Sequence, residues 1–211
     1  MAARVGGRDR AERRGDMGAS MTWSDVLAVD GFSSPLTRAV LNRAVSTVPR
    51  ARILEVGSFK GSTTSALCHG NDVECIHCID NHSEFGDTRV ELLDVCQRFA
   101  LPATIHDLDY FAPFPTDVFG GTKFSVYHYD GPHAEEQHAA ELTIALPHLA
   151  DAFLYIVDDY SWECVHRGCD AGLRALEGRV KVVSKKVYES EGLNDAGGYW
   201  NGLLVAWCEK T

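Results

Sequence analysis

Two short acidic motifs could together hold a metal ion. Asp130 lies in the first motif, at residues 129–133, and Asp158 and Asp159 lie in the second, at residues 157–160. Three carboxylates that converge on one cleft repel one another, and burying them unpaired is unfavourable. A hard divalent cation resolves this conflict, because oxygen ligands suit Mg²⁺, Mn²⁺ and Ca²⁺. The alternative is that Asp158 or Asp159 caps the helix that follows.

A histidine beside the first motif could act as a general base. His133 follows Asp130 at the predicted start of a helix, so its ring could face the same cleft. An imidazole titrates near neutral pH, which suits it to take a proton from an attacking hydroxyl group. Asp130 is the competing base, and a structural role for His133 is the alternative because the chain contains nine histidines.

A loop with two glycines, at residues 55–63, could bind a nucleotide-like ligand. Gly57 lets the backbone turn sharply after an apolar run, and Gly61 lets the next helix begin close to a ligand. Amide groups at that helix start favour a carboxylate or a phosphate. Glu55 could accept a hydrogen bond from an ammonium group or a bound water. The three-glycine dinucleotide fingerprint is absent, and a purely structural strand–helix turn is the alternative.

Two further acids follow apolar runs. Asp80 ends the run at residues 74–79, where a carboxylate can accept both hydroxyl groups of a ribose. A solvated loop aspartate is the alternative. Asp107 lies in the segment 106–111, whose polar and aromatic side chains suit an adenine ring. We therefore take Asp107 as the predicted contact to the base.

These motifs are separated by alternating β and α patterns. Apolar runs predict strands at 52–57, 74–79, 103–106, 124–129, 152–157, 180–187 and 199–207. Helical spacing predicts helices at 34–48, from about 61, and at 87–99, 133–146 and 164–176. The alternation predicts an α/β, Rossmann-like, doubly wound fold with a mostly parallel seven-stranded sheet and an antiparallel C-terminal edge hairpin. Ligands of such sheets bind outside the carboxyl ends of the strands, where the motifs lie.

Length and charge limit the organisation of the chain and its partners. The 211 residues suit one domain, at 21–211, after an Arg/Gly-rich tail at 1–20 that we expect to be flexible. A targeting peptide is the alternative for the tail, although its acidic residues argue against it. The net charge of −10 disfavours nucleic acids and anionic membranes as partners.

The cysteines favour a reducing compartment. Their number, seven, is odd, and neither a signal peptide nor a run of about 18 apolar residues is evident. We therefore expect a cytoplasmic protein with reduced thiols. Cys75 and Cys78 have the spacing of a redox or zinc motif, but they lie in an apolar run without a second pair, which favours buried strand cysteines.

Residues 53–63 closely resemble the first motif of class I S-adenosylmethionine-dependent methyltransferases. Residues 129–133 and 156–160 resemble the metal-dependent O-methyltransferases of the macrocin type, which act on sugars of natural products. Catechol O-methyltransferases are more distant relatives of that type. The chain departs from the pattern at residues 149–152, where the family has Pro-Gly-Gly, and at Pro132. These departures weaken the prediction of a sugar substrate.

The resemblance implies methyl transfer from S-adenosylmethionine to a hydroxyl group of a sugar, polyketide or catechol-like small molecule. It implies a divalent metal, with Mg²⁺ expected, held by Asp130, Asp158 and Asp159, and His133 or Asp130 as the base. The predicted cofactor-binding residues are Glu55, Gly57, Ser58, Phe59, Gly61, Ser62, Thr63, Asp80 and Asp107. Trp162 and Trp200 could wall the acceptor or pack in the core.

Relatives in this family often form homodimers, so a homodimer is one expectation for this chain. Three other functions stay open on the same sheet. They are a nucleotide-sugar or nicotinamide-dependent enzyme, a metal-dependent hydrolase and a non-catalytic nucleotide-binding protein.

Overall fold

The computed structural model describes residues 2–4, 21–113 and 117–211. The tail predicted to be flexible, at residues 1–20, lies outside the described residues except for residues 2–4. In the described part of the chain, no helix is both long and apolar enough to cross a membrane.

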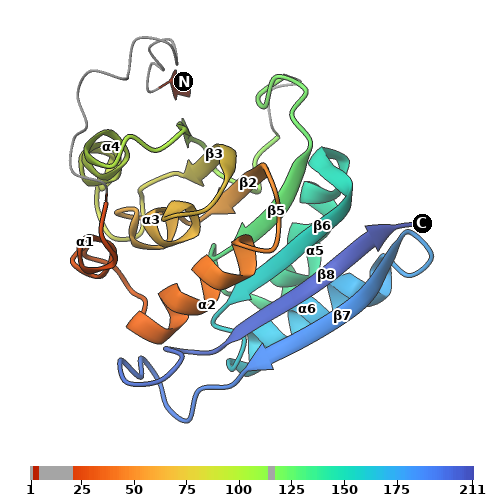
Figure 1. Cartoon of the computed structure of the whole chain (residues 1–211). Coiled ribbons are helices and arrows are strands. Elements are labelled where there is room, and N and C mark those ends of the chain that lie inside the picture. The colour runs from red at the N-terminus through yellow and green to blue at the C-terminus, as the bar shows by residue number, and fades with distance from the viewer. Residues whose placement is uncertain (1, 5–20, 114–116) are drawn as a thin grey trace.

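One mixed sheet forms the centre of the molecule (Figure 1). Its strands are β1 (Ala2–Arg4), β2 (Ala51–Val56), β3 (Val73–Asp80), β4 (Ala103–Asp107), β5 (Phe124–Tyr129), β6 (Leu149–Asp158), β7 (Val180–Tyr188) and β8 (Leu203–Lys210). The spatial order is β1-β4-β3-β2-β5-β6-β8-β7. The five central strands are parallel, and β8 runs antiparallel to both β6 and β7. The predicted seven-stranded sheet with its antiparallel hairpin is therefore confirmed, and β1 adds an antiparallel edge strand that the sequence did not predict.

Helices cover both faces of the sheet, as the doubly wound prediction requires. They are α1 (Trp23–Leu27), α2 (Pro35–Val45), α3 (Ser62–Cys68), α4 (Arg89–Arg98), α5 (Glu135–Ala145) and α6 (Glu163–Ala175), with a 3₁₀ turn at Leu146–His148. The predicted start of α2 is confirmed, because the Ser34 side chain accepts a hydrogen bond from the backbone N–H of Thr37 at 3.0 Å and Pro35 is the first helical residue.

The strands bury side chains on both faces, so the core has two parts. Helices α2, α3 and α4 pack on one face, over residues such as Ile53, Val126 and Ile156. Helices α5 and α6 pack on the other face, over Tyr127 and Tyr155. Because successive side chains of a strand point to opposite faces, the two core parts share the same strands.

The carboxyl ends of the parallel strands lie level with one another. Val56 of β2 pairs with both Ile79 of β3 and Tyr129 of β5, and Tyr129 pairs with Val157 of β6. Strand order reverses at β2, since the chain continues from β2 to β3 and β4 on one side and to β5 and β6 on the other. Ligand sites of open α/β sheets form at this kind of switch point.

Candidate functional site

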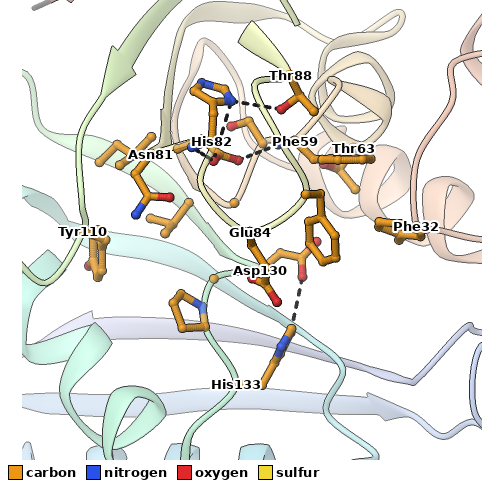
Figure 2. Close-up of a pocket in the computed structure, with 18 of the residues that line it drawn as sticks. Phe32, Phe59, Thr63, Asn81, His82, Glu84, Thr88, Tyr110, Asp130 and His133 are labelled. Carbon is orange, nitrogen blue, oxygen red and sulfur yellow. Dashed lines mark hydrogen bonds and ion pairs between the residues drawn. The ribbon is translucent and has the colours of Figure 1, made fainter. Parts of the chain in front are cut away.

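A cavity of about 380 Å³ opens at the carboxyl edge of the parallel strands. The loops after β2, β3, β4, β5 and β6 all contribute to its wall, together with the connection between β7 and β8. Figure 2 shows side chains from several of these loops around it, among them Phe59, His82, Tyr110 and Asp130. The cavity therefore lies where the sheet topology predicts a ligand site.

The loop after β2 lines one end of this cavity. We call it the donor end, because the resemblance given above predicts that the methyl donor S-adenosylmethionine binds this loop. Gly57 has a φ of 82°, and a Cβ at this position would lie 1.7 Å from the backbone oxygen of Asp130. Only glycine therefore lets the loops after β2 and β5 meet. Of the predicted cofactor-binding residues in this loop, the wall includes Gly57, Ser58, Phe59, Ser62 and Thr63. Gly61 is outside the wall and packs beneath it, against α4.

Glu55 does not face the cavity. Its carboxylate is fully buried and accepts hydrogen bonds from the hydroxyl groups of Thr63 at 2.7 Å and Thr64 at 2.5 Å. His128 Nδ1 lies 3.4 Å from Glu55 Oε1. Burial opposes the charged form, but these contacts, led by His128, lower the pKa of Glu55. Glu55 thus fixes the start of α3, and the contact to a ligand ammonium predicted for it finds no support in this geometry.

Asp80 links two loops at the donor end. Its Oδ2 accepts the backbone N–H of Phe59 at 2.8 Å, and its Oδ1 accepts the backbone N–H of His82 at 2.7 Å. Both oxygens keep further lone pairs, and the side chain lines the cavity, so Asp80 can accept the hydroxyl groups of a ribose as predicted.

Asp107 is directed away from the cavity. Its Oδ2 lies 2.5 Å from Nη1 of Arg89 at the solvent-exposed start of α4, and Asp107 is not part of the wall. The neighbouring residues Leu108, Asp109 and Tyr110 line the cavity instead. The sequence analysis predicted a contact to the base from Asp107, which is the last residue of β4 and whose side chain pairs with Arg89 of α4.

The opposite end of the cavity, which we call the acidic end, contains Asp130, His133 and Asp159. His133 Nε2 lies 2.6 Å from Asp159 Oδ2 and 3.9 Å from Asp130 Oδ1, and Figure 2 shows His133 directed at Asp130. One potential ligand atom from each residue lies within 4.8 Å of the others. Within the described residues, this is the group that could hold a metal ion.

Burial and charge shift the proton affinities at the acidic end. Burial raises the pKa of Asp130, and the nearby charge of Asp159 adds to this, while His133 opposes it. Burial alone would lower the pKa of His133, but hydrogen bonds and charge from Asp130 and Asp159 raise it to about 10. Asp130 and Asp159 therefore hold the imidazole in its protonated form as long as no other cation neutralises them.

Asp158 does not join this group. It is 2% exposed, its Oδ1 accepts the backbone N–H of Asp159 at 2.9 Å, and it is not part of the cavity wall. Strand alternation explains the difference, because Asp158 is the last residue of β6 and points into the sheet face. Asp159 follows in a left-handed conformation, with a φ of 55°, and lies in the wall. In the structure, the residue that lies beside Asp130 and Asp159 is therefore His133 and not the predicted Asp158.

The donor atoms at the acidic end fit a divalent cation. Asp159 Oδ1 and Asp158 Oδ2 are both buried and have no hydrogen-bond partner within the described residues. A buried carboxylate oxygen without a donor is unfavourable unless a cation or a proton compensates it. The carboxylates of Asp130 and Asp159, whose ligand atoms lie within reach of one point, offer the oxygen ligands that Mg²⁺ or Mn²⁺ accepts.

Aromatic side chains close the acidic end. Trp162 and Trp200 were predicted either to wall the acceptor or to pack in the core, and both side chains line the cavity. The ring of Trp162 lies 5.0 Å from that of His133. Trp200 belongs to the segment at residues 189–202 between β7 and β8, which Ser34 of the α2 cap contacts by donating a hydrogen bond to the oxygen of Gly198 at 2.6 Å.

Backbone strain is concentrated around the cavity and marks residues that the sequence reading missed. Seven non-glycine residues of the described chain have positive φ, and five of them line the cavity: Phe59, His82, Asp159, Asn194 and Trp200. Such conformations persist where the surrounding structure enforces them, often at functional sites. The sequence reading overlooked His82, Asn194 and Asn201. The asparagines and glycines of residues 192–202 were the signal, because these residue types favour left-handed turns.

Comparison with solved structures places the fold. An O-methyltransferase from Bacillus cereus, solved with S-adenosylhomocysteine, has a TM-score of 0.61 at 16% identity, covering 90% of this chain and 92% of that one. TomG, an O-methyltransferase of tomaymycin synthesis from Streptomyces achromogenes, has a TM-score of 0.62 at 19% identity, with 84% and 81% covered. NodS, an N-methyltransferase from Bradyrhizobium japonicum, has a TM-score of 0.59 at 15% identity, with 87% and 90% covered. At these identities the likeness shows the fold alone.

Sequence comparison supplies the family. A search of curated proteins gives no match. The family model described as a methyltransferase domain matches residues 54–160, which is half of the chain. The matched segment begins in β2, includes Asp80, Asp130 and His133, and ends just after Asp159. The chain therefore belongs to the methyltransferase domain family.

Proposed function

We propose that this protein transfers the methyl group of S-adenosylmethionine to a hydroxyl group of a small molecule, with the help of a divalent cation. The observation that carries this proposal is the single cavity that joins Asp80 at the donor end to Asp130, His133 and Asp159 at the acidic end. A methyl donor and a hydroxyl acceptor that share this cavity would be held next to each other. Membership of the methyltransferase domain family supports the same reaction class.

The donor end suits the parts of S-adenosylmethionine. Asp80 would accept the ribose hydroxyl groups, and the Leu108–Tyr110 segment would lie along the adenine ring. The loop from Gly57 to Thr63 would hold the methionine part. Some proteins with this fold have been solved with S-adenosylmethionine or S-adenosylhomocysteine, which supports the choice of donor.

At the acidic end, Asp130 and Asp159 would hold the cation, with Mg²⁺ as the expected ion. A divalent cation held there would lower the pKa of the acceptor hydroxyl and neutralise the charges that raise the pKa of His133. Participation of Asp158 as a ligand stays a prediction, since its side chain lies behind the wall.

The protein's own residues account for the remaining requirements. His133 would take the hydroxyl proton, and Asp159, 2.6 Å away, would stabilise the resulting imidazolium. Trp162 and Trp200 would exclude water and hold the acceptor against the methyl group. Holding the two reacting atoms close and in line supplies a large part of the rate of such a transfer.

The charge of the wall restricts the acceptor. Five acidic side chains line the cavity, namely Asp80, Glu84, Asp109, Asp130 and Asp159. The wall contains no Lys or Arg among the described residues. An anionic acceptor would be repelled, so we propose that the acceptor is neutral or cationic.

The test separates this function from its rivals. We expect calorimetry to show binding of S-adenosylmethionine and no binding of NAD. We expect labelled methyl groups to enter hydroxylated compounds in a metabolite extract, and chelation by EDTA to stop this transfer until Mg²⁺ is restored. Metal-driven phosphoester cleavage without any methyl donor, and no thermal stabilisation by S-adenosylhomocysteine, would instead identify a hydrolase. Binding of the donor without turnover would identify a non-catalytic binding protein.

A further inference from the structure

Arg38 is a buried cation that has no carboxylate partner among residues 21–113 and 117–211. It lies on α2 and is 4% exposed. Its guanidinium donates to the backbone oxygens of Val26 at 2.8 Å and Val29 at 2.9 Å, and its Nε donates to Ser33 Oγ at 2.9 Å. In the described chain, the acid whose charge acts on it is Asp30, which is itself paired with Lys60 at 2.7 Å. Arg38 thus adds positive charge close to the donor end.

The hydrogen bonds of Arg38 permit a short chain of donors that runs through Ser33 to Ser62. A guanidinium can only donate, so Ser33 Oγ acts as the acceptor of the bond from Nε. The Ser33 hydroxyl hydrogen is then available to Ser62 Oγ, which lies 3.3 Å away. If Ser62 accepts this bond, its own hydroxyl hydrogen is available to the cavity, because Ser62 is part of the wall. In that orientation the chain ends in a hydroxyl donor at the cavity wall.

Gly31 allows this chain to form. A Cβ at position 31 would lie 2.2 Å from Ser62 Oγ and 2.6 Å from Ser62 Cβ. Only a residue without a side chain lets the segment before α2 approach the start of α3 this closely. Arg38 fixes the same segment through the oxygens of Val26 and Val29. Gly31 and Arg38 thus both help to bring Ser33 and Ser62 into contact.

We propose that Arg38 is a positioning residue that acts through Ser33 and Ser62 to bind the carboxylate of the methyl donor. This inference rests on the proposed function, because S-adenosylmethionine supplies the carboxylate. The wall has five acidic side chains, which repel an anion, so a carboxylate in this cavity needs a directed donor and nearby positive charge. Arg38 supplies the positive charge, and Ser33 and Ser62 connect it by hydrogen bonds to the cavity wall.

The test compares two methyl donors that differ only in the carboxylate. We would measure the Kd of S-adenosylmethionine and of decarboxylated S-adenosylmethionine by calorimetry for the wild type and for Ser33→Ala, Ser62→Ala and Arg38→Lys. We expect each variant to weaken binding of S-adenosylmethionine by about tenfold, the size of one hydrogen bond to a charged group, and to leave the decarboxylated compound within about twofold. The double variant Ser33→Ala/Ser62→Ala should lose no more affinity for S-adenosylmethionine than either single variant, because the two hydroxyl groups act in series.

Ser65→Ala is the matched control. Ser65 is a buried serine of the same helix whose hydroxyl donates to the backbone oxygen of Ser62 at 2.8 Å. We expect this variant to change the affinities for the two donors by equal factors.

Equal losses for both donors in Ser33→Ala and Ser62→Ala would overturn the inference and leave a structural role for Arg38. If the wild type binds S-adenosylmethionine and its decarboxylated form equally well, the inference is overturned while the proposed function stands. If the wild type binds neither compound, the proposed function fails and the inference fails with it.

Discussion

The two ends of the cavity satisfy their carboxylates in different ways. At the donor end, both oxygens of Asp80 accept backbone N–H groups, and both oxygens of the supporting Glu55 accept threonine hydroxyls. At the acidic end, Asp159 Oδ1 is buried without a hydrogen-bond donor in the described chain, and so is Oδ2 of Asp158 behind the wall. The protein thus completes one end with its own groups and leaves the other end to be completed by a cation or a proton.

This difference suits the two ends of the cavity to two tasks, ligand recognition at one end and activation of the acceptor at the other. A donor end with fixed hydrogen bonds can recognise one constant ligand with little rearrangement on binding. An acidic end with unsatisfied charge is unfavourable by itself, but its electrostatic interactions change strongly when a cation or a substrate arrives. Recognition of the methyl donor and activation of the acceptor should therefore respond separately to mutation.

The largest expected effect comes from breaking the acidic end with Asp159→Asn. Asparagine keeps the shape and tolerates the left-handed backbone at this position, where φ is 55°. Because Asp159 is proposed to hold the cation, loss of its carboxylate should slow methyl transfer by about 4 kcal/mol in activation free energy, or roughly 1000-fold. The affinity for S-adenosylhomocysteine should stay within about threefold, which calorimetry would measure.

The control for this variant is Asp151→Asn, which removes an exposed carboxylate at the far end of the same strand, β6. Its activity and metal requirement should match the wild type. Equal losses of metal dependence and of donor affinity in Asp159→Asn would contradict the separation of the two ends.

A second experiment sharpens the comparison with a buried carboxyl group outside the cavity. Glu141 of α5 is fully buried and accepts a hydrogen bond from the Tyr155 hydroxyl, and burial raises its pKa from 4.5 to about 8. The folded protein therefore keeps a proton that the unfolded chain loses above about pH 4.5. The contribution of Glu141 to stability should be highest below that pH and should fall, on the order of 4 kcal/mol, as pH rises from about 5 to about 8.

Urea unfolding at a series of pH values would measure this decline. Glu141→Gln, which cannot lose a proton, should flatten the curve in that range, while Glu136→Gln, at an exposed position of the same helix, should leave it unchanged. An unaltered slope in Glu141→Gln would show that another group is responsible.

A smaller effect is expected from Asp80→Asn at the donor end. The amide keeps one acceptor for the N–H groups of Phe59 and His82 but loses the charge that strengthens the ribose hydrogen bonds. We expect S-adenosylhomocysteine to bind about tenfold more weakly, as calorimetry would show. The apparent affinity for Mg²⁺ should not change, and a parallel loss of Mg²⁺ binding would mean that the two ends are coupled.

The smallest effect is expected from Asp107→Asn, next to the donor end. The carboxylate of Asp107 pairs with Arg89 outside the wall, so its removal should change donor affinity by less than about twofold. A clear loss of S-adenosylhomocysteine binding by calorimetry would return Asp107 to the donor site that the sequence had suggested.

Sequence patterns sufficed to predict the fold and one residue of the cavity wall at or just after the end of each of β2, β3 and β5. Strand runs ending in Gly57, Asp80 and Asp130 were recognisable because apolar patterning stops where the chain leaves the sheet. The directions in which individual side chains point could not be predicted from these patterns. Glu55 and Asp158 lie inside strands, where alternation turns them into the sheet faces, while the left-handed Asp159 turns into the cavity.

The connection between β7 and β8 was the least predictable part of the site. Its sequence was read as part of a strand from residue 199, but β8 begins at Leu203. Asn194 and Asn201 hydrogen-bond to each other at 2.7 Å and 3.1 Å and bring the segment to the cavity. Such a fold depends on long-range contacts, including Ser34 to Gly198, that local sequence does not encode.

That same connection could be exchanged as a cassette. Residues 189–202 supply Asn194, Trp200 and Asn201 to the wall, and both ends of the segment are fixed by the hairpin strands β7 and β8. Transplanting loops of other length and composition between these strands would reshape this part of the cavity, while the residues proposed to bind the methyl donor lie outside the exchanged segment. The hairpin thus offers protein engineers a place to vary the acceptor of the proposed reaction.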